Sequence, residues 1–486
     1  MTTNQQGIQD FNTGGVGMGS ADSIEQTIAR HIVSTRFEDL PPDAISATKE
    51  HILHTVGTVL AGSAAPGVGE LIALLQETGG TPESTILGWG IRVPAVNAAM
   101  ANSTMGHAQD FDNNDDRIAY KTSVCAVPSA LAVAERRGST SGRELITATC
   151  IGIDLGIRMG LAVQPYPAHS QSCELGPFAA AVAVAKLIGL NEDQTWDALG
   201  LALCGVALLG CSIEGLTYSK RFMAGAASRN GTFAALLAAK GFRARQGVFA
   251  GSGNFYSGAW RCEADSARLL DGLGTLFEVV NVGPKPYSSC RYTHGPIDGA
   301  LALMASNEFA IEDVEQVRVA VGPRDYAMVF GGADGLGTKQ QPQSIVDAQF
   351  SIPYTVAVAM VQRKVFFDDF TASAICRPEI LAISRRVVPV VRKDFDAWPN
   401  DVKPCEVEVL TRDGRRHVQR IDYARGNPRN PVPHAEIRAN FLACAERTPK
   451  KLRRGDVERA RDLIEELETV TDVTQIPALL SPVGSE

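Results

Sequence analysis

The chain has 486 residues, of which 45% are hydrophobic and 21% are charged, a composition typical of a globular protein rather than a disordered or fibrous one. Its net charge of −8, without a sustained run of Lys and Arg, argues against a nucleic-acid partner, because phosphate binding requires a concentrated basic face. The longest nearly uncharged apolar stretch, residues 201–213, is shorter than the roughly 20 residues that cross a bilayer, so we expect no membrane-spanning segment.

The first 21 residues are rich in Gly, Asn and Gln and lack a basic start followed by an apolar run. We interpret residues 1–21 as a disordered leader rather than a signal peptide, and we expect a cytoplasmic protein. The ten cysteines include no C-x-x-C pair, so neither a zinc site nor a disulfide framework is predicted. His51 and His54 share one helical face, and we interpret them as packing or surface residues rather than metal ligands.

Residues 22–282 have the pattern of a helical domain in which Ala, Gly and Leu dominate. Ser141 and Glu144 form a capping box that predicts a helix over residues 145–163. A later helix is expected to end at Gly241, since glycine readily adopts the left-handed conformation that follows a last turn. Only 6% of the residues are aromatic, so we expect these helices to pack closely through small side chains.

The pattern changes over residues 283–424, which mix strands and helices. Residues 314–321 alternate as in a strand, and residues 405–423 predict a hairpin. The segments 352–361 and 378–388 keep helical spacing, so we expect helices on one face of an antiparallel sheet. This part is predicted to form a smaller α+β domain.

Residues 425–486 close the α+β part with a segment of Gly, Asn and Pro and then return to charged amphipathic helix. These last helices could rejoin the first domain. The chain shows no repeat of fixed period.

A first polar cluster begins at His107 and contains Asp110, Asp112 and Asn114, with Lys121 shortly after it. Polar groups this dense suggest a loop at a helix end, where one carboxylate could accept a proton or bind substrate and Lys121 could attract an anion. The alternative is a solvated acidic loop. A calcium site is not predicted, because the spacing lacks the glycine and the final glutamate of an EF-hand loop.

A second cluster places Lys220 beside Arg221 at the start of a helix that is otherwise apolar. A helix N-terminus favours anions, and two cations there would make a pocket for a carboxylate or a phosphate. The alternative is that both side chains are simply solvated or ion-paired.

A third cluster, at the expected junction between the domains, contains Lys285, Tyr287, Cys290, Arg291 and His294. A basic group, a phenol, a thiol and an imidazole this close together could face a cleft, although a lone histidine is more often a structural residue. Since Cys290 has no evident partner that would activate a nucleophile, a thiol mechanism is not favoured.

These three clusters, in this order and followed by residues 342–354, resemble the MmgE/PrpD family of 2-methylcitrate dehydratases and cis-aconitate decarboxylases. The most specific motifs lie within residues 219–231, 247–255 and 285–294. The resemblance implies a mainly α fold, with a large all-helical domain built from both chain ends and a smaller inserted α+β lid domain. It also implies an active site in the cleft, no required cofactor and a homodimer.

Carried over residue by residue, the resemblance places Asp110 in the family's acidic motif and Lys220 at its helix-start lysine. Lys285 matches the lysine of the lid, and His294 matches a later lid histidine.

Some positions depart from the family pattern. Lys121 stands where a histidine usually follows the acidic loop, and Asn114 replaces the usual threonine. A second family histidine falls at Ser170 in strict register, with His169 adjacent, and Cys290 stands where decarboxylase-like members carry another histidine.

The candidate catalytic residues are Asp110, Lys121, His169, Lys220, Lys285 and His294. The candidate substrate-binding residues are Asn114, Arg221, Tyr287 and Arg291. Cations in a closed cleft would hold the carboxylates of a polycarboxylate and stabilise the negative charge that develops beside them. We expect a lyase that dehydrates a small hydroxylated di- or tricarboxylate; the alternatives are a decarboxylase, an epimerase, or a family member that has lost its chemistry and serves as a binding scaffold.

Overall fold

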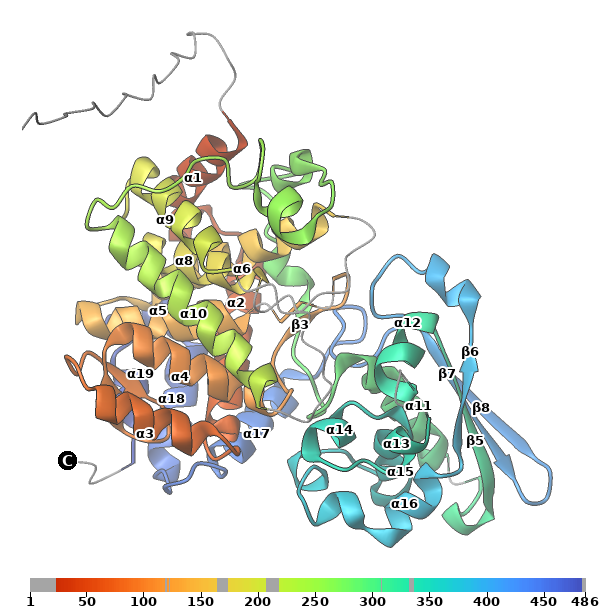
Figure 1. The fold of residues 1–486 in the computed structure, drawn as a ribbon. Helices are drawn as coiled ribbons and strands as arrows, with labels where there is room; N and C mark the ends of the chain where they lie inside the picture. The colour runs from red at the N-terminus through yellow and green to blue at the C-terminus, as the bar shows by residue number, and fades with distance from the viewer. Residues whose placement is uncertain are drawn as a thin grey trace, which may run out of the picture.

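Figure 1 shows the computed structural model of the chain. The structure describes residues 23–118, 120–121, 123–163, 174–206, 218–306, 308–331 and 336–482. The predicted leader at 1–21 and the candidate catalytic residue His169 lie outside these ranges. Among the helices within these ranges, none combines the length and the apolar character that a membrane span requires.

The chain folds into a helical body and a smaller α+β body (Figure 1). The first part of the helical body contains α1 Ile24–Ser34, α2 Pro42–Gly62, α3 Val68–Thr78, α4 Ala95–Ala108, α5 Ser123–Arg137, α6 Gly142–Leu161, α8 Gly176–Leu187, α9 Glu192–Cys204 and α10 Ser219–Ala238. Its second part contains α17 His434–Ala445, α18 Arg454–Glu465 and α19 Gln475–Leu479. Since α17 and α18 pack against α2 and one apolar core contains side chains from both parts, the helical domain is built from both chain ends, as predicted.

Local sequence accounts for where these helices begin and end. The Ser141 hydroxyl accepts from the Glu144 N–H, and the Glu144 carboxylate accepts from the Ser141 N–H, so the predicted capping box starts α6. Gly241 follows α10 in the left-handed region at φ +85°, also as predicted. Helix α10 begins at Ser219, so Lys220 lies in its first turn.

Small residues bring α10 close to its neighbours. A Cβ atom on Gly225 would lie 2.0 Å from the Thr104 hydroxyl of α4, and one on Gly231 would lie 2.2 Å from the Pro177 carbonyl of α8. Helix α10 is therefore packed tightly between α4 and α8, which fixes the position of its first turn and of Lys220.

The α+β body contains the helices α11 His294–Ala305, α12 Pro323–Asp325, α13 Leu336–Gln340, α14 Ile345–Gln349, α15 Ile352–Gln362 and α16 Pro378–Ser384. Its strands are β5 Val314–Val321, β6 Val387–Val391, β7 Cys405–Thr411 and β8 Arg416–Ile421. They form one sheet in the order β6-β5-β7-β8, and Figure 1 shows α11 and α15 on one side of it. This body has an apolar core of its own.

Two predictions for this sheet need correction. The sheet is mixed rather than antiparallel, because β6 pairs with β5 in parallel. The helix predicted over residues 378–388 ends at Ser384, and the valine-rich strand β6 begins at Val387. β-Branched residues favour a strand there, and Pro389 is tolerated because β6 is an edge strand.

Two short ribbons lie outside this sheet. The ribbon of β1 Ser84–Ile86 and β2 Ile91–Val93 belongs to the otherwise helical domain, which was predicted to be all-helical. The second ribbon pairs β3 Asn114–Asp115 with β4 Val282–Gly283, and it ties the acidic loop to the segment that enters the α+β body.

The two connections between the bodies touch each other. A Cβ atom on Gly283 would lie 1.5 Å from the carbonyl oxygen of Gly426, so glycine is required at this crossing. Gly426 itself has a φ of +90°, in the left-handed region. We propose on this basis that the α+β lid spans residues 283–424, the boundaries expected from the sequence.

Buried histidines in α2 make stability depend on pH. Burial lowers the pKa of His51 to about 4 and that of His54 to about 3, whereas histidines of the unfolded chain titrate near 6.5. The unfolded chain therefore binds more protons below pH 6.5, and the free energy of unfolding should fall as the pH is lowered from about 6.5 towards about 4. We expect a loss of roughly 2 kcal/mol per histidine between pH 7 and pH 5, measured by urea denaturation.

The substitution His51→Gln is the control for this prediction. The side-chain amide can still donate to the Val279 carbonyl, which lies 3.0 Å from His51 Nε2, but it does not titrate. The variant should lose less stability than the wild type over the same pH range. Equal losses in the two proteins would contradict the prediction.

Candidate active site

The acidic loop follows the last turn of α4 and is buried. Asp110 is only 1% exposed and has a φ of +50°, a left-handed conformation that Asp tolerates better than most residues. Asp112 and Asn114 are also buried. The alternative of a solvated acidic loop is therefore wrong, and the burial of carboxylates requires positive partners nearby.

Two lysines from distant parts of the chain meet at Asp110. Lys220 Nζ, in the first turn of α10, lies 2.6 Å from Asp110 Oδ1. Lys285 Nζ lies 3.4 Å from the same oxygen and donates to the Asp110 carbonyl at 2.9 Å. The structure therefore brings together three of the candidate catalytic residues, one from each polar cluster.

Lys121 is the third cation of this group. It follows Tyr120, which is fully buried and whose carbonyl accepts from the Asp115 N–H at 3.0 Å. Burial, and then the charge of Lys285, lower the pKa of Lys121 below its usual value, against the opposing effect of Asp110. An ammonium group whose pKa is lowered in this way can release a proton more readily than an ordinary lysine.

Asp110 stays ionised in this setting. Burial alone would raise the pKa of its carboxyl group, but the ammonium groups of Lys220, Lys285 and Lys121 hold it well below its usual value. With Asp112, the site combines two buried carboxylates with three lysines, and the remaining positive charge suits a substrate that carries carboxylates.

His107 and Asp112 form a buried pair beside Asp110. His107 Nδ1 lies 2.9 Å from Asp112 Oδ2. Burial lowers the pKa of His107, so the ring is neutral at pH 7, while the pKa of Asp112 is about 2 because His107 and the lysines outweigh its burial. That His107 and Asp112 pair with each other was not predicted from the sequence. The H-x-x-D-x-D spacing at a helix end was the pattern that could have indicated it.

Two carboxylate oxygens in the loop stay without a protein partner. Within the described residues, no hydrogen bond reaches Asp110 Oδ2 or Asp112 Oδ1, although both atoms are buried. Buried acceptors of this kind are expected to meet a donor from substrate or water.

His107, Asp110 and Asp112 place one ligand atom each within 4.8 Å of one another, a spacing that a metal ion could use. The charges argue against a cation there. Lys220 already contacts one oxygen of Asp110, and His107 contacts one oxygen of Asp112. The positive charge of the lysines would also repel a metal ion. We therefore assign no metal to these residues.

His294 is positioned as a structural residue. Its Nε2 lies 3.2 Å from the Ser289 carbonyl, and its Nδ1 lies 3.1 Å from Arg291. Burial and then Arg291 hold the pKa of His294 well below its usual value, so the neutral ring donates from Nε2 and accepts at Nδ1. Ser289 also accepts from Lys285 at 3.2 Å, so His294 supports the lysine rather than facing the carboxylate of Asp110.

Asp116 holds two of the residues proposed to bind substrate. Arg291 contacts both of its carboxylate oxygens at 2.7 Å, and Asn114 donates to it at 2.9 Å. A third such residue, Tyr287, donates to Asp298 at 2.6 Å. These groups are used within the protein, so the geometry favours structural roles for them over substrate binding.

Arg221 points away from this group, whereas Cys290 is close enough to Asp110 and the lysines for their charges to act on its thiol. Arg221 donates to the Pro66 carbonyl at 2.6 Å and lies 5.0 Å from the ring of Tyr218, so the geometry does not favour substrate binding by Arg221. Burial and then Asp110 raise the pKa of Cys290 to about 11, which keeps its thiol protonated at neutral pH. A thiol mechanism is therefore not supported, as expected from the sequence.

The structural role of Arg291 can be tested with Arg291→Lys. Lysine cannot make the two parallel hydrogen bonds to Asp116, so the free energy of unfolding should fall by about 2 kcal/mol. The KM for substrate, measured at a temperature where both proteins are folded, should change less than threefold. A rise in KM above tenfold with unchanged stability would instead support substrate binding by Arg291.

Two known family models match most of the chain. The family model described as the MmgE/PrpD N-terminal domain matches residues 26–262, and the MmgE/PrpD C-terminal domain matches residues 287–468. The chain belongs to the MmgE/PrpD family. The resemblance read from the three polar clusters is thereby confirmed, as is the mainly α fold that it implied.

Several curated relatives align along nearly their whole length. A cis-aconitate decarboxylase of Aspergillus terreus is 25% identical over 477 residues, which cover 92% of this chain and 94% of the relative. The cis-aconitate decarboxylase of Homo sapiens is 24% identical over 486 residues, 94% of each chain. A cis-aconitate decarboxylase-like protein of Aspergillus oryzae is 24% identical, over 94% of this chain and 97% of its own length.

Within this MmgE/PrpD chain, the site belongs to neither body alone. Asp110, Lys121 and Lys220 come from the helical body, whereas Lys285 lies just after β4, where the chain leaves it for the α+β body. The ion pairs of Asp110 therefore depend on how the two bodies are joined.

Proposed function

We propose that this protein is a cofactor-independent lyase that decarboxylates a small unsaturated polycarboxylate of the cis-aconitate kind. The observation that carries the proposal is the convergence of Lys220 and Lys285 on a buried carboxylate, with Lys121 beside them. The names of the relatives favour decarboxylation, the alternative from the sequence, over the dehydration that we placed first.

The geometry supports a simple sequence of steps. Lys220 and Lys285 would hold the carboxylates of the substrate and stabilise negative charge that develops next to them. As the C–C bond to the leaving CO₂ breaks, its electron pair spreads over the adjacent double bond and a neighbouring carboxylate. The ammonium group of Lys121 would then donate a proton to carbon, and water would return a proton to Lys121.

Dehydration of a hydroxylated acid such as 2-methylcitrate is the second candidate. It is favoured by the unpartnered oxygens Asp110 Oδ2 and Asp112 Oδ1, which can accept a hydrogen bond from the hydroxyl group of such a substrate. Epimerisation would remove and return a proton at carbon without loss of water. A non-catalytic scaffold would keep the lysines and show no turnover.

One experiment separates these activities. The purified protein is incubated with cis-aconitate, citrate, 2-methylcitrate and substituted succinates in D₂O, and each reaction is followed by proton NMR and by CO₂ release. We expect CO₂ from cis-aconitate and one deuterium in the product. Loss of water from 2-methylcitrate would favour the dehydratase, deuterium exchange alone would favour an epimerase, and anion binding without turnover would favour the scaffold.

We also propose that the protein is a cytoplasmic homodimer that acts on a small-molecule substrate, without a nucleic-acid or membrane partner. The family membership supports the dimer, and the net charge of −8 argues against nucleic acid. Light scattering on the protein as it elutes from a size-exclusion column would measure its mass, and a mass of one chain, 51.8 kDa, would contradict the dimer.

A further inference from the structure

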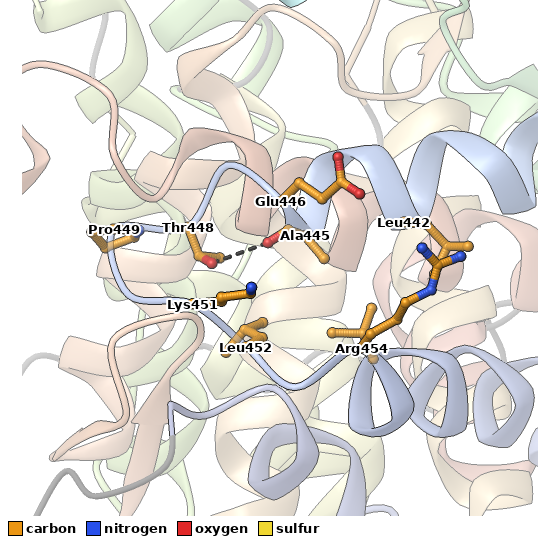
Figure 2. A pocket seen from close by; sticks show the side chains of 9 residues that line it. Leu442, Ala445, Glu446, Thr448, Pro449, Lys451, Leu452 and Arg454 are labelled. Atoms are coloured by element: carbon orange, nitrogen blue, oxygen red, sulfur yellow. Dashed lines mark hydrogen bonds between the residues drawn. The ribbon is translucent and has the colours of Figure 1, made fainter.

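A pocket of 640 Å³ lies on the helical body, where the chain turns from α17 into α18 (Figure 2). Its volume falls within the range of about 300–1,000 Å³ that small-molecule sites occupy. Its lining includes no residue of the candidate active site. We call it the α17–α18 pocket.

The apolar part of this pocket is aliphatic. Leu442 and Ala445 of α17, Pro449 and Leu452 of the connecting loop, and Val457 of α18 supply it. Of the residues that line the pocket in the described structure, none carries an aromatic ring on which a nucleobase could stack. The walls therefore suit a hydrocarbon chain.

The loop at the pocket is basic. Five cationic side chains occur between residues 447 and 454: Arg447, Lys450, Lys451, Arg453 and Arg454. Lys451 lines the pocket, and Figure 2 shows its ammonium group directed inward over Leu452. The carboxylate of Glu446 points away from that group, and Arg454 is paired with Glu458 at 2.9 Å. Lys451 therefore directs its positive charge towards a ligand in the pocket.

The start of α18 offers backbone N–H groups to an anion, next to the carboxylate of Asp456 in its first turn. This 12-residue helix begins at Arg454, and the preceding residue, Arg453, makes no side-chain hydrogen bond to its first turn. Unpaired N–H groups and the helix dipole favour an anion at such an end. The cation and the helix end thus lie beside the same aliphatic wall.

We propose that the α17–α18 pocket binds an aliphatic carboxylate. The carboxylate lies against Lys451 and the first turn of α18, and the hydrocarbon chain covers Leu442 and Leu452. The proposal does not depend on the reaction at Asp110.

Octanoate is the probe for this site. Calorimetric titration of the full chain with octanoate, below the concentration at which it forms micelles, should show saturable binding. Octanol lacks the charge and should bind about fivefold more weakly, acetate lacks the chain and should not bind measurably, and octylamine carries the wrong charge and should not bind.

The adjacent lysine provides a matched control. Lys451→Glu should weaken octanoate binding about tenfold, whereas Lys450→Glu, which changes the net charge equally at a residue outside the lining, should change it less than twofold. Turnover should be unchanged in both variants. Absence of saturable binding, equal effects of the two substitutions, or equal binding of octylamine would each overturn the proposal.

Discussion

Replacing Lys121 with methionine is expected to lower kcat by about a thousandfold, because a general acid typically contributes 10²–10⁴ in rate. Burial and the charge of Lys285 lower the pKa of Lys121, and its ammonium group is close enough to Asp110 to help keep that carboxyl group ionised. Methionine fills a similar volume without a proton to give. Steady-state kinetics would measure the loss in kcat, with the acid that the D₂O experiment identifies as the substrate.

The control is Lys121→Arg, which keeps the positive charge but holds its proton across the whole working range. Since the pKa of Lys121 lies below that of an ordinary lysine, its ammonium form is present at lower pH and is lost as the pH rises through that lowered value. The wild-type kcat should therefore fall as the pH rises through this value. Lys121→Arg should still bind the substrate, but its kcat should not show this fall. A Lys121→Met variant with more than a third of the wild-type kcat would show that another group delivers the proton.

The sequence predicted most of the fold because its signals were local. The capping box at Ser141, the glycine at Gly241 and the alternation of residues 314–321 each depend on a few neighbouring residues, and each was found in the structure. The direction of β6 depends instead on how the chain crosses the sheet through α15 and α16, and no local pattern reports that.

The site was predicted as three clusters, and the structure joins them at one carboxylate. That Lys220 and Lys285 both reach Asp110 could not be read from the sequence, because the contact spans 110 residues in one case and 175 in the other. That Arg291 and Asn114 have a partner within the protein was missed for a related reason. Their partner, Asp116, lies in the acidic loop, and a charged residue looks the same in sequence whether it faces a substrate or a buried carboxylate.

One contact between the two bodies is an aromatic pair beside Asp110. Phe111, between Asp110 and Asp112, packs edge-on against Phe367 of the α+β body with ring centroids 5.0 Å apart. Arg447 of the helical body lies 5.0 Å from the ring centroid of Phe367 and pairs with Asp368 at 2.5 Å. We infer that Phe367 is a positioning residue that holds the loop of Asp110 in place.

Phe367→Ala is therefore expected to lower the free energy of unfolding by about 3 kcal/mol, the usual cost of emptying a buried phenylalanine site. It should also lower kcat/KM by tenfold or more at a temperature where the variant is folded, because Phe111, next to Asp110, loses its edge-on contact with Phe367 and keeps, in the α+β body, the more distant ring of Phe366 at 5.8 Å. Denaturation by urea and initial rates on the same preparation measure the two effects.

Phe395→Ala separates positioning from stability. Phe395 lies in the same body and is equally buried, 3% exposed like Phe367, but it packs with Arg392 and Arg420 rather than with the acidic loop. It should lose comparable stability and keep its kcat/KM within about twofold, because the geometry around Asp110 is untouched. If both variants kept the wild-type kcat/KM while folded, Phe367 would hold the bodies together without setting the position of the carboxylate.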